Sequence, residues 1–359
     1  MWITKRWILA ILLAVGVLPT VAIGGDSWRV GAASAKITPE TFMWMAGYGG
    51  RDRPAEATLT DLWAKALVLE DEEGRRAVLI SLDLVGIDRK LSHRICSSLH
   101  ERYSLERNQI AICNSHTHSG PVVGQNLAPL HYLVVDDGQQ KLIDRYARTL
   151  EQTVVEVVGE AIEQVEPARL SWGSGTATFA VNRRNNRESE VPQARVAGKL
   201  LGPVDHDVPV LAARGADGHL SAVVFGYACH ATVLSSYQWS GDYPGFAQIE
   251  LENIYPDCVV LFFAGCGGDQ NPLPRRSVGL AEHYGRRLAN AVDQVLLTTK
   301  MNGVSSSLKA TYHEINLPFD KLPTREAIEK DAADANPHVA SRARMLLAQM
   351  VDGQPLAST

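Results

Sequence analysis

Histidine and carboxylate side chains occur in three short polar segments, each of which directly follows an apolar run. The first segment, Asn114–Pro121, reads NSHTHSGP and follows Ile110 to Cys113. In an extended chain, residues two apart project to the same side, so His116 and His118 can point into one pocket. Such imidazole pairs are common zinc ligands, although an isolated pair also occurs as a hydrogen-bonding feature at a strand end.

The other two segments add a third histidine and a glycine-rich loop. His230 follows the apolar run 222–228, and Gly241-Asp242 comes shortly after it. The third segment, Gly265–Pro272, reads GCGGDQNP. Its glycines let the backbone approach a ligand and present its amides, and Asp269 adds a carboxylate. A structural histidine and a tight turn are the alternative interpretations.

The elements that must position these segments alternate between short β-branched runs and longer helical patterns. This alternation predicts an α/β fold: a mixed, largely buried β-sheet with flanking helices. Strands are expected at residues 28–37, 62–70, 77–84, 109–114, 168–172, 208–213, 220–227, 258–264 and 306–317. Helices are expected at residues 89–102, 139–165, 243–254, 279–297 and 324–350, and residues 179–207 are predicted to form a long polar loop.

In open α/β sheets, ligands bind beyond the carboxyl ends of the strands, which is where all three polar segments begin. The sequence therefore predicts an active site at that edge of the sheet. We expect His116 and His230, with His118 as an alternative or additional ligand, to hold a Zn²⁺ ion that lowers the pKa of a water molecule to ~7. Arg183 in the polar loop could bind a carboxylate or an oxyanion.

Composition excludes several classes of protein. The chain has 359 residues, of which 45% are hydrophobic and 21% charged, and a formal net charge of -5. These values exclude a disordered or coiled-coil protein, and without a basic patch no nucleic-acid partner is expected.

The five cysteines include no CxxC pair and predict no disulfide framework; Cys113, Cys229, Cys258 and Cys266 are expected to be buried and reduced. No internal repeat is apparent.

The chain is expected to have three parts. Residues 1–22 carry early basic residues, an apolar run and small residues, which predicts a signal peptide for secretion or export to the periplasm; an uncleaved membrane anchor is the alternative. Residues 23–300 are predicted to form the α/β catalytic domain. Residues 301–359 are expected to form a helical C-terminal tail or a shortened remainder of that domain.

These residues resemble the neutral/alkaline, non-lysosomal ceramidase family. The resemblance lies in His116 to Pro121 (HTHSGP), Asn182-Arg183, Tyr227 to His230, Gly241-Asp242 and Gly268-Asp269 with Pro272, with weaker similarity at Met45 to Tyr48. It implies a zinc-dependent hydrolase that cleaves the amide bond of N-acylsphingosine or a related lipid amide, with peripheral membrane contact. The family pattern implies that His116 and His230 bind zinc. It also implies that His118, Arg183 and Asp269 are catalytic and that Asp242, Gly267 and Gly268 contact substrate.

The sequence departs from the family pattern in two places. The family loop reads GDxSP, and its serine has a central catalytic role, whereas Asn271 stands at that position here. An asparagine cannot form an acyl-enzyme but can donate a hydrogen bond to an oxyanion, so a zinc-bound water is expected to attack. The glutamate and tyrosine that complete the family's zinc site have no match after Lys309; His118, Asp83 or Asp242 could substitute. The alternative function is a catalytically degenerate domain that binds a lipid or another ligand.

Overall fold

The computed structural model describes residues 28–298, 300–350 and 356–358, so the predicted signal peptide lies outside the described residues. Its main sheet contains β1 (Trp28–Lys36), β3 (Trp63–Glu70), β4 (Arg76–Leu82), β5 (Ile110–Asn114), β6 (Glu166–Thr176), β8 (Asp207–Gly215), β9 (Leu220–Tyr227), β11 (Val259–Ala264) and β13 (Asn302–Gly303). The helices that cover it are α1 (Arg89–Tyr103), α2 (Asp137–Glu163), α4 (Asp242–Ile254) and α5 (Val278–Thr298).

The nine strands form one mixed sheet in the order β11-β9-β8-β6-β1-β3-β4-β5, with β13 beside β6. The pairs β4–β5 and β9–β11 are parallel, and the other neighbouring pairs are antiparallel. Each parallel pair is joined by a crossover helix, α1 or α4, as parallel neighbours require. The predicted α/β class with a mixed sheet and flanking helices is confirmed.

The chain repeats one order of elements in its two halves. Residues 28–163 contain β1, β3, β4, α1, β5 and α2, and residues 166–298 contain β6, β8, β9, α4, β11 and α5. In each half, two antiparallel pairings are followed by a helix, a parallel strand and a second helix. No repeat was apparent in the sequence. Two segments can form the same order of strands and helices when their apolar positions follow the same pattern, even if the residues at those positions differ.

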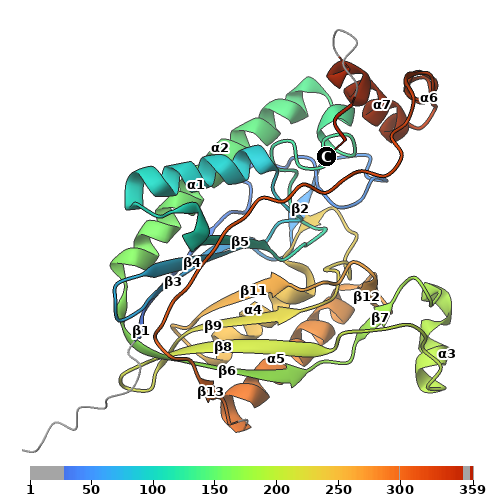
Figure 1. Ribbon diagram of the computed structural model, residues 1–359. Coiled ribbons are helices and arrows are strands. Elements are labelled where there is room, and N and C mark those ends of the chain that lie inside the picture. Colours follow the sequence, from blue (N-terminus) through green and yellow to red (C-terminus); the bar gives the residue numbers. More distant parts are fainter. Residues whose placement is uncertain (1–27, 299, 351–355, 359) are drawn as a thin grey trace, which may run out of the picture.

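The two halves of the sheet fold over one another. Strands β1 and β6 join them through only three residue pairs, from Trp28–Ala168 to Val30–Glu166. The buried Lys65 of β3 donates from Nζ to the carbonyl of Val260 on β11, 2.9 Å away, so the edge strand of one half lies over the other half. Figure 1 shows the resulting layers, with α1 and α2 outside one half and α4 and α5 outside the other.

Smaller elements surround this core. They are β2 (Ala57–Thr58), β7 (Ala180–Asn182), β10 (Gln238–Trp239), β12 (Gln270–Pro272), α3 (Val191–Val196), α6 (Arg325–Ala332), α7 (Pro337–Gln349) and three 3-10 turns at Arg107–Gln109, Tyr132–Val134 and Glu188–Glu190. Strand β2 pairs with β10, and β7 pairs with β12. The predicted loop 179–207 is therefore only partly irregular, because it contains β7 and α3.

Three expectations about the chain were wrong. Residues 306–317 form no strand; the segment crosses the molecule in irregular conformation, and its apolar Ile315 and Leu317 stay exposed. The helix expected at 324–350 is divided into α6 and α7, since Asn336 caps α7 and Pro337 supplies its first residue. Cys266 is exposed, whereas Cys96, Cys229 and Cys258 are buried. The five cysteines are free.

Among residues 28–298, 300–350 and 356–358, no helix combines the length and apolarity that crossing a membrane requires.

A close approach between β1 and α2 gives a test of the fold. A Cβ atom at Gly31 would lie 2.0 Å from the Ala161 carbonyl oxygen and 2.9 Å from the Val165 nitrogen. Because both neighbours are backbone atoms, we expect Gly31→Ala to lower the free energy of unfolding by about 3 kcal/mol in urea titration. Gly279→Ala is the control, since no atom lies within 4 Å of its added Cβ. Equal stability of the two variants would contradict this packing.

Candidate metal centre and catalytic cleft

The three polar segments meet at one end of the molecule. Residues 115–121 follow β5, residues 228–234 follow β9 and residues 265–269 follow β11. Two backbone hydrogen bonds tie them together: His118 N donates to Ala231 O over 3.1 Å, and His230 N donates to Gln270 O over 3.0 Å. The predicted convergence at the carboxyl ends of the strands is confirmed, and the site is built from both halves of the chain.

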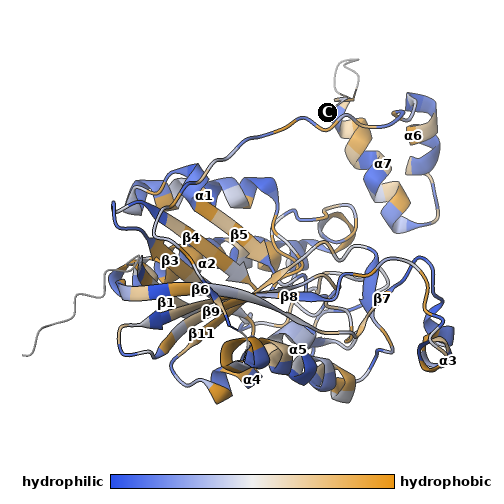
Figure 2. Ribbon diagram, turned by 60° about the horizontal axis from the view of Figure 1, so that its bottom comes forward, coloured by the Kyte–Doolittle hydropathy of each residue, from blue (hydrophilic) through white to orange (hydrophobic). Residues whose placement is uncertain are grey.

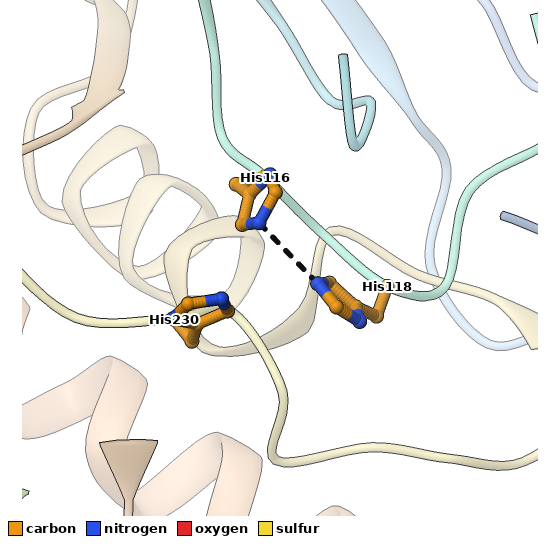
Figure 3. Close-up of side chains that lie close together, drawn as sticks. All are labelled: His116, His118 and His230. Atoms are coloured by element: carbon orange, nitrogen blue, oxygen red, sulfur yellow. Dashed lines mark hydrogen bonds between the residues drawn. The ribbon is translucent and has the colours of Figure 1, made fainter. Parts of the chain in front are cut away.

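Three imidazole rings face one another at this meeting point (Figure 3). The ring centroids of His116, His118 and His230 are 4.9 to 5.7 Å apart. One ligand nitrogen from each ring lies within 4.8 Å of the others, and in the described part of the chain this is the only such cluster of three or more His, Cys, Asp or Glu residues.

Backbone carbonyls orient two of the three rings. His116 Nδ1 lies 2.7 Å from the Val85 oxygen, and His230 Nδ1 lies 2.8 Å from the Gly267 oxygen. A carbonyl can only accept, so each Nδ1 carries a proton, and each neutral ring keeps its lone pair on Nε2. Histidine ligands of metals are oriented in this way, with the second ring nitrogen bonded to an acceptor. Burial lowers the pKa of His230, which favours its neutral form.

His118 is held differently. Its Nδ1 is buried and has no hydrogen-bond partner, and its Nε2 lies 3.4 Å from His116 Nε2. Burial, with a smaller contribution from the neighbouring His116, lowers the pKa of His118 to about 3. The ring is therefore neutral at physiological pH and can offer a lone pair.

The donor set is suited to a zinc ion. Two nitrogens that each bind a tetrahedral zinc at ~2.0 to 2.1 Å are separated by about 3.3 Å, which agrees with the spacing of the His116 and His118 Nε2 atoms. Without a cation, one of these nitrogens would have to carry a proton and donate a hydrogen bond to the other. The site thus offers three imidazoles, two of which are already held with Nδ1 bonded to a carbonyl and Nε2 left for a metal.

A cavity of about 380 Å³ lies beside the histidines. His116, Cys229 and His230 line it, together with Asn114 at the end of β5, Ala264 at the end of β11 and residues 265–268 after β11. Gly267 and Gly268, predicted to contact substrate, are among these residues, and the exposed Cys266 lies between Gly265 and Gly267. A Cβ at Gly267 would lie 2.5 Å from the Cys229 nitrogen, so only glycine allows the loop to pass so close to β9.

Arg183 and Asp269 belong to a network behind the glycine loop. Arg183 N donates to the Asp269 carbonyl, and its Nη2 donates to the Gly268 carbonyl, both over 2.7 Å. Asn182 Nδ2 donates to the Asp269 carboxylate over 3.2 Å. Burial and the nearby Arg184 lower the pKa of Arg183. Strands β7 and β12 carry this network and fix the loop beside His230.

Asn271 lies on β12, one residue after Gln270, whose carbonyl accepts from His230. Its side chain is 4% exposed, and Oδ1 has no hydrogen-bond partner. The residue pairs with Val181 of β7, so its backbone is fixed. It is thus a buried amide, next to the residue that bonds His230, with an unpaired Oδ1, and it is not among the residues that line the cavity.

Two acidic residues considered as alternative ligands lie outside the cluster. Asp242 is fully buried and accepts hydrogen bonds from the amides of Val233, Leu234 and Tyr243. Burial raises its pKa to about 6. Asp83 is also buried and accepts from Trp63 N over 3.1 Å. Both support the loops, and Asp242 does not line the cavity in which we expected it to contact substrate.

A support for His118 was not recognised from the sequence. We call residues 45–51 the support loop. A Cβ at Gly47 would lie 2.5 Å from His118 Cγ, the Tyr48 ring lies 4.9 Å from the His118 ring, and the buried Arg51 donates from Nη2 to His118 O over 2.9 Å. The weak similarity at Met45 to Tyr48 was the only sequence signal for this contact.

Comparison with known proteins places the chain in a family. Residues 28–259 match the family model described as "Neutral/alkaline non-lysosomal ceramidase, N-terminal". The chain belongs to the neutral/alkaline non-lysosomal ceramidase family. The family resemblance seen in the sequence is thereby confirmed; the matched residues include the HTHSGP segment and end before the GGD segment.

Relatives and solved structures agree with this assignment. The neutral ceramidase of Pseudomonas aeruginosa is 27% identical over 259 residues, which are 64% of this chain and 37% of the relative. That of Oryza sativa subsp. japonica is 25% identical over 259 residues, 70% of this chain and 32% of the relative. The crystal structure of the Pseudomonas aeruginosa enzyme matches with a TM-score of 0.67 and 20% identity, over 79% of this chain and 46% of that chain. A structure titled "Ceramidase complexed with C2" also has a TM-score of 0.67 at 21% identity, and covers 79% of this chain and 45% of that chain.

These structural matches show that the fold is shared. The chain spans about a third of the length of these two curated relatives and somewhat less than half of the matched structures.

Gly47 gives a test of the site geometry. Gly47 has a φ of +94° and contacts His118, so we expect Gly47→Ala to displace the His118 ring and to weaken zinc binding by about tenfold or more. Competition with a chromophoric chelator measures this change. Gly50→Ala in the same loop is the control, because no atom lies within 4 Å of its added Cβ. If both variants bind zinc like the wild-type protein, packing at Gly47 does not orient His118.

Proposed function

We propose that this chain is a zinc-dependent amidohydrolase that cleaves the amide bond of N-acylsphingosine or a related lipid amide. The observation that carries the proposal is the cluster of three histidines, two of which are held through Nδ1 by Val85 O and Gly267 O, which leaves their Nε2 atoms for a metal. Membership of the ceramidase family supports the reaction class, and the names of the relatives support the substrate class.

His116, His118 and His230 would hold the zinc ion, which when bound supplies a Lewis acid beside the cavity. Assigning His118 as a third ligand agrees with the additional ligand that the residues themselves suggested and differs from the catalytic role that the family resemblance implied. The 3.4 Å separation of its Nε2 from His116 Nε2 supports this assignment. The pKa of His118, lowered to about 3 by burial, also makes the ring a poor carrier of a proton near neutral pH.

The glycine loop would bind the acyl part of the substrate. No atom lies within 4 Å of the position that a side chain on Gly268 would take, so a substrate can approach the backbone there. Arg183 is bonded to Gly268 O and can donate its remaining N–H groups to a carbonyl or carboxylate oxygen. Asn271 can donate a hydrogen bond from its side-chain amide to an oxyanion, the role expected from its position in the sequence.

The proposal extends to the location and surroundings of the protein. A signal peptide at residues 1–22 would direct it to the periplasm or the exterior, and a lipid substrate would bring it into peripheral contact with a membrane. The substitution of Asn271 for the family's serine favours one competing function, a domain that binds a lipid amide without hydrolysing it.

Metal analysis and a hydrolysis assay test the proposal together. We expect the purified wild-type protein to hold about one equivalent of zinc by mass spectrometry, and His116→Ala and His230→Ala to hold roughly a tenth or less. The wild-type protein should release fatty acid from N-acylsphingosine faster than from simple esters or N-acyl amino acids. Asn271→Ala should retain zinc and part of the activity, because Asn271 is not a ligand.

His313→Ala is the matched control, since this histidine is exposed and lies outside the site. A wild-type protein without bound zinc would contradict the metal site. Stoichiometric zinc without hydrolysis of any of these substrates would instead favour the binding domain. Activity that survives His230→Ala but is lost in Asn271→Ala would contradict the assigned roles.

A further inference from the structure

The C-terminal helix α7 packs against the support loop. His338, in the first turn of α7, has its Nε2 2.8 Å from the Gly49 carbonyl oxygen. Asn336 caps the helix by accepting from His338 N over 3.0 Å, which fixes the start of α7 and hence the position of this ring. Figure 2 shows α6 and α7 as a pair set apart from the sheet, joined to it by the long segment that follows β13.

A second histidine, which is buried, also bonds to the support loop. His131 directly precedes the 3-10 turn Tyr132–Val134 and is 1% exposed. Its Nε2 accepts from the Gly47 amide over 3.1 Å. The support loop is therefore bonded at Gly47 by His131 and at Gly49 by His338.

Both histidines bond to the support loop through Nε2. His131 Nε2 accepts a hydrogen bond from the Gly47 amide, so the proton of the neutral ring is on Nδ1, and His338 Nε2 donates to the Gly49 carbonyl. Both Nδ1 atoms are buried without another partner. Burial, with the neighbouring His338 as a smaller cause, lowers the pKa of His131 to about 4, which keeps the ring neutral.

The support loop matters most for the one site histidine that lacks a carbonyl partner. Val85 O and Gly267 O orient His116 and His230. His118 Nδ1 has no such partner, so the orientation of its ring depends on packing against Gly47 and Tyr48 and on the bond from Arg51 to its backbone. Any element that fixes the support loop therefore also fixes His118.

We propose that α7 positions His118 in the metal site, with His338 and His131 as the positioning residues and the support loop as the connection. This inference rests on the proposed zinc site and gives the C-terminal segment a role in it. His338 and His131 touch neither the cavity nor the ligand nitrogens, and they act through Gly49 and Gly47.

Two substitutions at His338 distinguish the effect of the hydrogen bond to Gly49 from the effect of the imidazole ring itself. His338→Gln places an amide nitrogen near the position of Nε2 and can still donate to Gly49 O. His338→Asn is shorter and loses that bond. His313→Asn is the matched control, because His313 lies in the same C-terminal segment and is exposed. Loss of one hydrogen bond at a peripheral helix should leave the core folded, and thermal melting checks this.

The first readout is the dissociation constant for zinc, measured in the full chain by chelator competition. We expect His338→Asn to raise it about tenfold, and His338→Gln and His313→Asn to remain within about twofold of the wild-type value. Hydrogen exchange of peptides that cover residues 45–51 should be faster in His338→Asn only.

The second readout does not need zinc. Long-range ¹H–¹⁵N NMR of the zinc-free protein reports the environment of the His118 ring, which should change in His338→Asn and stay unchanged in His338→Gln.

Unchanged hydrogen exchange of residues 45–51 in His338→Asn would show that α7 does not hold the loop. Faster exchange with unchanged zinc affinity and unchanged His118 signals would show that the loop does not position His118. If wild-type protein binds no zinc, the proposed function fails, while exchange and NMR still decide the positioning role.

Discussion

The site depends on two hydrogen bonds from imidazole Nδ1 atoms to backbone carbonyls. Val85 and Gly267 supply the acceptors, and each belongs to a loop that follows a strand of the central sheet, β4 or β11. These bonds fix the tautomer and rotation of His116 and His230 before any ion binds. The loops have little freedom of their own, because Gly267 packs directly on the Cys229 backbone. The ligand nitrogens are therefore preorganised by backbone geometry.

The duplicated architecture explains why the histidines come from distant parts of the sequence. Each half of the chain ends its parallel strand pair at the same edge, and the short β1–β6 junction lets the halves fold so that these edges meet. His116 and His118 come from the first half and His230 from the second. Buried polar contacts such as Lys65 to Val260 O bind the halves together, so the stability of the site and that of the interface between the halves are linked.

Much of the fold and part of the site could be predicted from the sequence. Apolar runs such as 220–227 and 258–264 identified buried strands, and the polar residues that follow them identified the edge at which His116, His118 and His230 meet. Burial in three dimensions was not predictable: Asp242 was a candidate ligand but accepts hydrogen bonds from three backbone amides, and Cys266, expected to be buried, is exposed in the glycine loop. The contact of Gly47 with His118 and that of His338 with Gly49 join residues far apart in the chain, and neither has a local pattern that could reveal it.

The most direct test of a zinc centre shared by the two halves is X-ray absorption at the zinc edge of the full, zinc-loaded chain. The account predicts scattering from three imidazole nitrogens at ~2.0 to 2.1 Å, reduced by one imidazole in His118→Ala. A zinc environment with a single imidazole, or with sulfur at ~2.3 Å, would contradict it, because the metal would then not be held by His116, His118 and His230.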